Sequence, residues 1–334
     1  FWALKGGGGG SFGVLTSLTL KTHDLPDLLG GVSMRIKAAS DQDFHRLLAR
    51  FVDFYADSLL NPHWGEGITF SSDNVLDISM SSQGLSGGDA RTVWQPLMNW
   101  LQAQGSAFST TGLRAHADFA EGYWDVEGMR QENSRSIRLD TRPDAPRIHA
   151  WWDSNEDEVG VFLYGYDSLW LPRNLLEKAA RPKLADALFA ASRRMTIRLH
   201  FNKGLAGAPD EALEAARDTA TNPKVMDAFC LAIIADGGRP RYPGLPAATD
   251  QKHAEDSAKG VARATAILRA IAPDAGSYVS ESNYFDSEWR RHYWGTNYPR
   301  LVAIKAKYDP DGLFTVHHGV GSQDWSADGF TRKA

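Results

Sequence analysis

The sequence predicts an α+β fold in which an antiparallel sheet is covered by helices. The first observation is the order of the patterns: a candidate strand at 32–38 precedes an amphipathic helix, and a hairpin then precedes a second helix. The second is composition, because 43% hydrophobic and 23% charged residues are typical of a globular chain. The third is a cleanly alternating run at 195–202, which is typical of a strand with one buried face.

Local signals justify the first elements. Ser40 is a suitable N-cap for the helix that follows the first strand, and apolar residues recur along that helix as one buried stripe. The stripe comprises Phe44, Leu47, Leu48, Phe51, Val52 and Tyr55. The alternating runs 67–70 and 75–80 are joined by a polar tetrapeptide and predict a hairpin. The second helix is expected at 89–104, where Pro96 implies a late start or a kink.

The middle of the chain has weaker patterns. Between 106 and 144 we expect loops and one short helix, because polar turns interrupt the apolar residues. An apolar run that contains the single cysteine, Cys230, is interpreted as part of a helix at 223–234. The Gly- and Pro-rich segment 237–249 is a surface loop or a lid. The other expected elements are strands within 146–171, helices at 173–180, 183–193 and 210–219, and a helix at 250–271 capped by Asp250.

Charge and composition argue against several classes of protein. The net charge of −5, with acidic and basic residues interspersed, gives no reason to expect nucleic acid or an anionic membrane as a partner. No apolar run approaches the ~20 residues that span a bilayer, so no membrane segment is expected. Cys230 alone cannot form an intrachain disulfide or a Cys-rich metal site, and we expect no metal.

The closing segment 277–325 concentrates strand, helix, turn and aromatic signals. Tyr278–Glu281 has the pattern of a short strand, and Tyr298–Tyr308 that of an amphipathic helix, which the turn residues at 309–312 end. The expected apolar side of this helix comprises Leu301, Val302, Ile304 and Tyr308, and its expected exposed side comprises Arg300, Lys305 and Lys307. These signals alone predict a C-terminal docking element.

Five consecutive glycines, Gly6–Gly10, stand near the start and have two interpretations. Runs of this kind form flexible linkers. This run, however, leads into residues 12–20, which alternate like a half-buried strand. Glycines joined to a strand suit a place where the backbone approaches a ligand closely, and their free N–H groups can bind an anion. The residues themselves leave a linker and a cofactor loop both open.

Two sets of motifs resemble one known family. The N-terminal set is the stretch Trp2–Val14 around the glycines. The C-terminal set comprises Tyr278…Glu281, Tyr293-Trp294-Gly295, Asn297-Tyr298, Lys305…Lys307-Tyr308-Asp309-Pro310, Leu313-Phe314 and the tail Val320-Gly321-Ser322…Trp325. In this order and spacing they resemble the berberine-bridge-enzyme-like FAD-linked oxidases of the vanillyl-alcohol-oxidase (VAO) superfamily. The tail is similar to the isoamyl-alcohol-oxidase-like branch, and the middle of the chain matches loosely.

The resemblance implies an organisation and a function. Residues 1–25 would be the last part of an FAD-binding domain, 26–275 a substrate-binding domain, and 276–334 a segment that returns to the FAD domain. Both termini would thus complete an FAD-binding α+β domain, whose remainder would come from a separate or cleaved N-terminal polypeptide. The implied activity is that of an FAD-dependent oxidoreductase. It would transfer hydride from an alcohol-type substrate (a sugar, an aromatic or an aliphatic alcohol) to the flavin, which O2 reoxidises. The resemblance leans toward an exported protein.

The resemblance also assigns roles to residues. Glu281 is the expected base for the substrate hydroxyl, since burial strengthens a carboxylate as a base, and Tyr278 would assist it or orient the substrate. Ser280 departs from the Asn that the family has there. His317 and His318 would lie at the flavin. Only one, His318, would stabilise negative charge on the ring, because neighbours on an extended segment point to opposite sides. The cofactor loop would comprise Gly7, Gly8, Gly9, Gly10, Phe12 and Gly13.

A substrate site is expected along the alternating run 195–202. Arg198, His200 and Asn202 share one face of this strand, which faces solvent or a polar pocket with Lys203-Gly204 at its rim. Trp152 is a further candidate for stacking on a small-molecule substrate. Two alternatives stay open: a non-catalytic module that binds carbohydrate or another small molecule, and a flavin-dependent dehydrogenase or cyclase that does not use oxygen.

Overall fold

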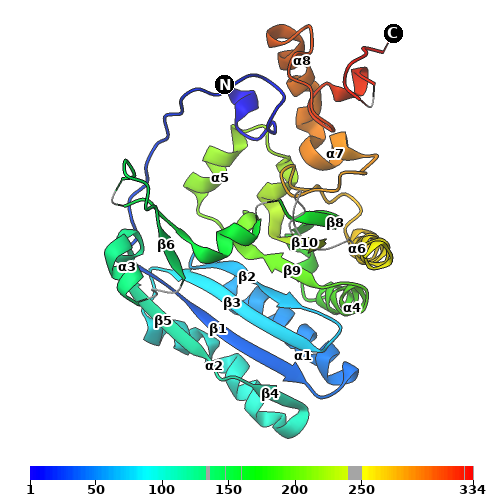
Figure 1. Cartoon of the computed structure of the whole chain (residues 1–334). Coiled ribbons are helices and arrows are strands. Elements are labelled where there is room, and N and C mark those ends of the chain that lie inside the picture. Colours follow the sequence, from blue (N-terminus) through cyan, green and yellow to red (C-terminus); the bar gives the residue numbers. More distant parts are fainter. Residues whose placement is uncertain (133–135, 147, 159, 240–249, 327, 334) are drawn as a thin grey trace.

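The chain forms one large antiparallel sheet with helices on one of its faces (Figure 1). The computed structural model describes residues 1–132, 136–146, 148–158, 160–239, 250–326 and 328–333. The strand order is β4-β1-β3-β2-β9-β10-β8, and β5 also pairs with β1. These strands are β1 (Leu28–Ala38), β2 (Trp64–Phe70), β3 (Val75–Gln83), β4 (Phe108–Thr110), β5 (Arg114–Phe119), β8 (Phe162–Pro172), β9 (Ile197–His200) and β10 (Ala228–Gly238). A separate pair consists of β6 (Ile137–Leu139) and β7 (Ala150–Trp152).

The helices that cover the sheet bury every second residue of its strands. Val32, Met34 and Ile36 of β1 belong to the same core cluster as the inward side chains of α1 (Asp41–Phe54). The covering helices also include α2 (Gly87–Ala103), α4 (Arg181–Ser192) and α6 (Gln251–Ile271). The remaining helices are α3 (Val126–Glu132), α5 (Asp210–Arg217), α7 (Trp289–Trp294) and α8 (Tyr298–Tyr308). On the opposite face, β9 presents polar side chains, whereas β8 and β10 present a second apolar cluster that includes Trp170, Leu231 and Ile233. The predicted α+β class is confirmed.

Helices with clear local signals form where the sequence predicts them. The Ser40 hydroxyl caps α1 by accepting a hydrogen bond from the Asp43 amide at 3.1 Å, and the predicted stripe of α1 is buried. The second helix begins slightly earlier than expected because Ser86 caps it, and Asp89 completes the capping box at the third helical position. Pro96 lies inside this helix. Helix α6 follows its Asp250 cap as predicted.

The predicted helix at 223–234 is wrong. Pro223–Asp227 forms a 3-10 turn, and the apolar run that follows is β10, one strand in from the sheet edge. A strand buried on both faces loses the alternation that identifies strands, so its continuous apolar sequence is indistinguishable from that of a buried helix. Cys230 is buried as expected, but on this strand.

Four further predictions of secondary structure are also wrong. Residues 12–20 run extended but have no strand partner among the described residues, and Val14 is 79% exposed. Alternation favours a strand, yet a strand forms only beside another. The region 106–144 contains β4, β5 and β6 in addition to its short helix, and only Arg173–Leu176 of the expected helix at 173–180 is helical, as a 3-10 turn. Tyr278–Glu281 is irregular, not a strand. Most of the segment 237–249 lies outside the described residues.

The two ends of the chain pack against each other (Figure 1). Ala3 joins Trp294, Leu301 and Val320 in a small apolar cluster apart from the main core. Lys305 on α8 is buried, contrary to the exposed position predicted for it, whereas Tyr308 is exposed. The Lys305 ammonium pairs with Asp309 and donates hydrogen bonds to the backbone carbonyls of Ser11 and Phe314, each at 2.7 Å. Through these contacts, the buried lysine joins the two ends of the chain.

Candidate active site on the open face of the sheet

Strand β9 carries polar residues on the face that the helices leave uncovered. Ile197 and Leu199 are buried under the helices, so the alternation of the strand directs Arg198 and His200 to the opposite face. Arg198 donates a hydrogen bond from Nε to the Thr69 hydroxyl on β2 at 3.3 Å. Glu66, Thr69, Arg198 and His200 line a hollow of about 370 Å³.

Glu66 adds a carboxylate to the lining of the same hollow. Its φ of +53° is unusual for a residue other than glycine and marks a local distortion of β2. The Asn202 amide donates to one Glu66 oxygen at 3.1 Å, while the other lies 3.5 Å from His200 Nδ1 without making a hydrogen bond. Burial, and then the nearby Lys203 ammonium, lower the pKa of His200, so its imidazole is neutral at neutral pH.

The segment that contains Tyr278 follows the free edge of β8. Trp170 N–H donates to the Gly276 carbonyl at 2.9 Å, and Tyr278 N–H donates to the Ser168 hydroxyl at 3.2 Å. The Ser277 hydroxyl donates to the Ser168 carbonyl at 2.5 Å. These bonds place the Tyr278 ring beside Trp170, with 6.1 Å between centroids, on the open side of β8.

Glu281 reaches the polar residues through Lys203. The Lys203 ammonium lies 2.6 Å from a Glu281 oxygen and 5.6 Å from the centre of the Tyr278 ring. The side chains of Lys203 and Glu281 are 31% and 26% exposed, so the ion pair is only partly shielded from solvent. Burial, and then the Glu281 charge, raise the pKa of Tyr166 to about 12. The structure thus brings together Arg198, His200, Asn202, Tyr278 and Glu281.

The sequence does not predict every residue of this cluster, and one predicted residue lies elsewhere. The sequence patterns do not point to Glu66 or Tyr166, and they place Lys203 only at the rim of the pocket. Neither the sequence nor the burial of β8 alternates, so no local pattern singles out Tyr166. Trp152 lies apart on β7, where it lines a separate hollow of about 540 Å³ with Phe119 and Tyr123.

The glycine loop lies against the segment that carries Tyr278 and Glu281. The Trp294 indole donates to the Gly6 carbonyl at 3.0 Å. A Cβ on Gly8 would stand 3.4 Å from the Val279 side chain, and one on Gly10 only 2.5 Å from Val316. Gly8 and Gly10 both have positive φ, of +83° and +72°, so side chains are excluded at Gly10 by space as well as by backbone conformation. A Cβ on Gly9 would meet open space.

The two histidines lie side by side, not on opposite sides as predicted. The His318 backbone has a φ of +54°, which bends the chain so that the His317 and His318 rings stack with 3.8 Å between centroids. Tyr284 stacks on the outer face of His317 at 3.8 Å, and Trp289 lies parallel to His318 at 5.2 Å. His318 Nδ1 is buried without a hydrogen-bond partner among the described residues. Burial, and then His317, lower the pKa of His318 to about 4.

The described residues offer neither a metal-binding cluster nor a helix that could cross a membrane. They contain no group of three or more His, Cys, Asp and Glu side chains arranged to hold a metal ion. Within the same residues, every helix is too short or too polar to cross a membrane.

The fold and site define a class: a helix-covered antiparallel sheet whose open face carries a polar cluster, closed by segments from both termini. Residues 272–321 match the family model described as berberine and berberine like. An uncharacterized FAD-linked oxidoreductase of Arthroderma benhamiae is 26% identical over 99% of this chain and 53% of its own length. Among solved structures, the VAO-type flavoprotein MtVAO615 of Myceliophthora thermophila has a TM-score of 0.68 at 20% identity, over 98% of this chain and 53% of that one. The glucooligosaccharide oxidase of Acremonium strictum has a TM-score of 0.63 at 18% identity, over 96% and 61%.

The chain is therefore similar in its C-terminal region to the berberine-like family and over nearly its whole length to FAD-linked oxidoreductases, and its fold resembles that of VAO-type flavoproteins. It spans about half the length of the first of these relatives, 53% of it. The motif resemblance is therefore confirmed, and the roles of individual residues stay predictions.

Proposed function

We propose that this chain is the substrate-binding part of an FAD-dependent oxidoreductase that oxidises an alcohol-type substrate. One observation carries the proposal: a loop near the start of the chain packs against two segments near its end, one of which reaches the polar cluster through the Lys203–Glu281 ion pair. These three segments are the glycine loop, the segment with Tyr278 and Glu281, and the histidine pair. Gly8 lies against Val279 and Gly10 against Val316, directly before His317. The relatives are named FAD-linked oxidoreductases, which supports FAD as the cofactor.

The residues present fit an FAD group. A Cβ on Gly9 would face open space, between Gly8 and Gly10 with their positive φ, and the His318 Nδ1 atom is buried without a partner among the described residues. The loop Gly7–Gly10 with Phe12 and Gly13 would hold the cofactor from one side, and His317 and His318 from another. When bound, FAD supplies the acceptor for the hydride that leaves the substrate carbon.

Glu281 is the proposed base. It would take the proton from the substrate hydroxyl as hydride leaves the carbon that bears this hydroxyl, so that an alcohol becomes a carbonyl compound. The pair with Lys203 fixes the direction of the carboxylate, which is the main requirement of a base that must reach one hydroxyl group. Neutral His200, Arg198 and Asn202 would bind the other polar groups of the substrate, and Tyr278 would orient it over the ring.

The proposal includes O2 as the oxidant that returns the flavin to its oxidised form, with hydrogen peroxide as the product. It also includes a separate or cleaved N-terminal polypeptide that completes the FAD domain with residues 1–25 and 276–334. The exposed apolar side chains of the extended segment 12–20 support this partner, because such a row is suited to pairing with further strands.

The test is Glu281→Gln in the flavin-loaded protein, assayed by oxygen consumption with sugars, oligosaccharides and aromatic and aliphatic alcohols. Loss of a positioned base lowers the rate about 10²–10⁴-fold, and the flavin content should stay the same. Unchanged turnover would exclude Glu281 as the base. Substrate binding without any reduction of the flavin would favour the non-catalytic binding module. Reduction without oxygen consumption would favour a dehydrogenase or a cyclase.

A further inference from the structure

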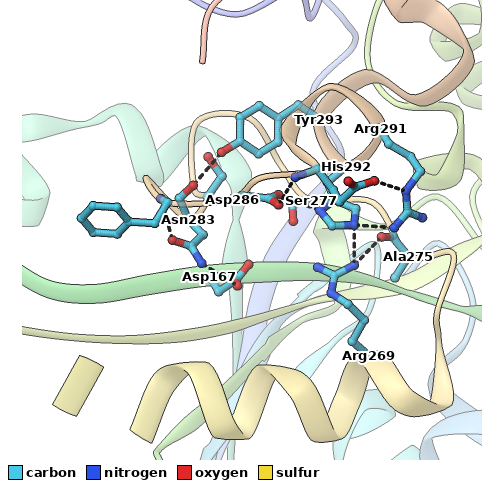
Figure 2. Close-up of polar contacts among 12 residues, drawn as sticks. Asp167, Arg269, Ala275, Ser277, Asn283, Asp286, Arg291, His292 and Tyr293 are labelled. Carbon is cyan, nitrogen blue, oxygen red and sulfur yellow. Dashed lines mark hydrogen bonds and ion pairs between the residues drawn. The ribbon is translucent and has the colours of Figure 1, made fainter. Parts of the chain in front are cut away.

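Both ends of the segment that carries Tyr278 and Glu281 are held by one arginine (Figure 2). Arg269 on α6 donates from Nη1 to the Ala275 carbonyl at 3.0 Å, where the segment begins. The same nitrogen lies 3.0 Å from Nε2 of His292, where the segment ends. Ser277 N–H donates to the His292 carbonyl at 2.7 Å, which joins the two ends directly. Residues 275–292 are thus a closed loop, called the base loop below.

His292 is held in one orientation by three charged neighbours. Its Nδ1 lies 2.6 Å from an Asp286 oxygen, and its Nε2 lies 3.0 Å from Arg269 and 2.9 Å from Arg291. Guanidinium groups can only donate, so Nε2 must accept and Nδ1 must carry the proton that Asp286 accepts. The side chains of His292 and Asp286 are only 6% and 12% exposed, so solvent cannot readily replace these partners.

A second set of contacts fixes the middle of the base loop. The Asn283 amide lies 3.4 Å from an oxygen of Asp167, a buried residue of β8. The Tyr293 hydroxyl donates to the Asn283 carbonyl at 2.8 Å. Glu281 stands two residues before Asn283, so its reach to Lys203 depends on this anchorage. The base loop is fastened to the helix layer through Arg269 and to the sheet through Asp167.

We infer that Arg269 and His292 are positioning residues for the proposed base. They touch neither the polar cluster nor the glycine loop in the described residues, and they act by holding the base loop so that Glu281 and Tyr278 stand over the open face of the sheet. The inference rests on the proposed function for the role of Glu281, while the fastening of the loop can be tested without it.

The test measures amide hydrogen exchange of peptides from the base loop in the 334-residue chain. Arg269→Met keeps the aliphatic stem but removes the donors, and exchange at 276–286 should rise at least ~10-fold by local opening. Arg263→Met is the matched control, an exposed arginine on the same helix, and should leave the loop unchanged. His292→Gln keeps an acceptor for Arg269 and should protect the loop better than His292→Phe, which keeps none. Arg269→Lys should restore part of the protection.

Turnover of the flavin-loaded protein gives the second readout. Arg269→Met should lower kcat about 10–100-fold through misplacement of the base, with unchanged flavin content, whereas Arg263→Met should not. Unchanged exchange at 276–286 in both Arg269→Met and His292→Phe overturns the inference. Faster exchange with unchanged kcat overturns the positioning role. If the wild-type protein oxidises no alcohol while exchange still responds, the proposed function fails and the fastening of the loop stands.

Discussion

Replacing Asp167 by Asn is predicted to stabilise the protein at neutral pH and to leave its stability unchanged at pH 4. Burial raises the pKa of Asp167 from 3.8 to about 6, against the opposing effects of Arg269 and the Ser168 amide. A carboxyl group whose pKa is higher in the folded state binds protons more tightly there. Folding is therefore favoured at low pH, and stability falls as the pH rises from about 4 to about 6. The shift of roughly two pK units corresponds to about 3 kcal/mol.

The assay is urea unfolding of the wild type and Asp167→Asn at several pH values between 4 and 8. The difference between the two proteins isolates this group, because the other titrating residues are the same in both. The variant should gain up to about 3 kcal/mol above pH 6. Asp274→Asn, at an exposed position, is the control and should show no pH-dependent difference. A difference that is constant with pH, or a variant that is less stable at pH 8, would refute the reasoning.

Two further predictions concern lysines. Lys305→Met should open the packing between the chain ends, because breaking a buried ion pair costs about 3–5 kcal/mol. Hydrogen exchange at residues 1–11 should rise sharply, but not in the control Lys307→Met at an exposed position of α8, and equal protection in both variants would contradict this. Lys203→Met should change unfolding stability by less than about 1 kcal/mol, since its ion pair is partly exposed. It should nevertheless lower turnover about 10-fold by freeing Glu281, and turnover equal to that of Lys224→Met would contradict the role of Lys203.

Much of the fold could be predicted because its signals are local. Ser40 and Asp250 mark helix starts by their own side chains, and the hairpin of β2 and β3 has alternating strands on both sides of a short turn. The pattern at 223–234 failed because burial on both faces removes alternation. The pattern at 12–20 failed because a strand needs a neighbour, which periodicity cannot supply.

The site could be predicted only in part, because its contacts are long-range. The face with Arg198 and His200 follows from alternation alone. Glu281 came from the motif resemblance, but its partner Lys203 stands 78 residues away, and no local pattern joins them. The burial of Lys305 could not be predicted either, because helical spacing places it near solvent and one of its partners, the Ser11 carbonyl, is 294 residues away. The stacking of His317 on His318 depends on the positive φ of His318, which the sequence does not predict.

The most direct test of the central claim is the absorbance spectrum of the purified protein, measured together with the intact mass of every polypeptide in the sample. The proposal predicts flavin bands in a sample that contains this chain and a second polypeptide that completes the FAD domain. A colourless sample in the presence of that polypeptide and excess FAD would contradict it, and the polar face of the sheet would then belong to a binding module.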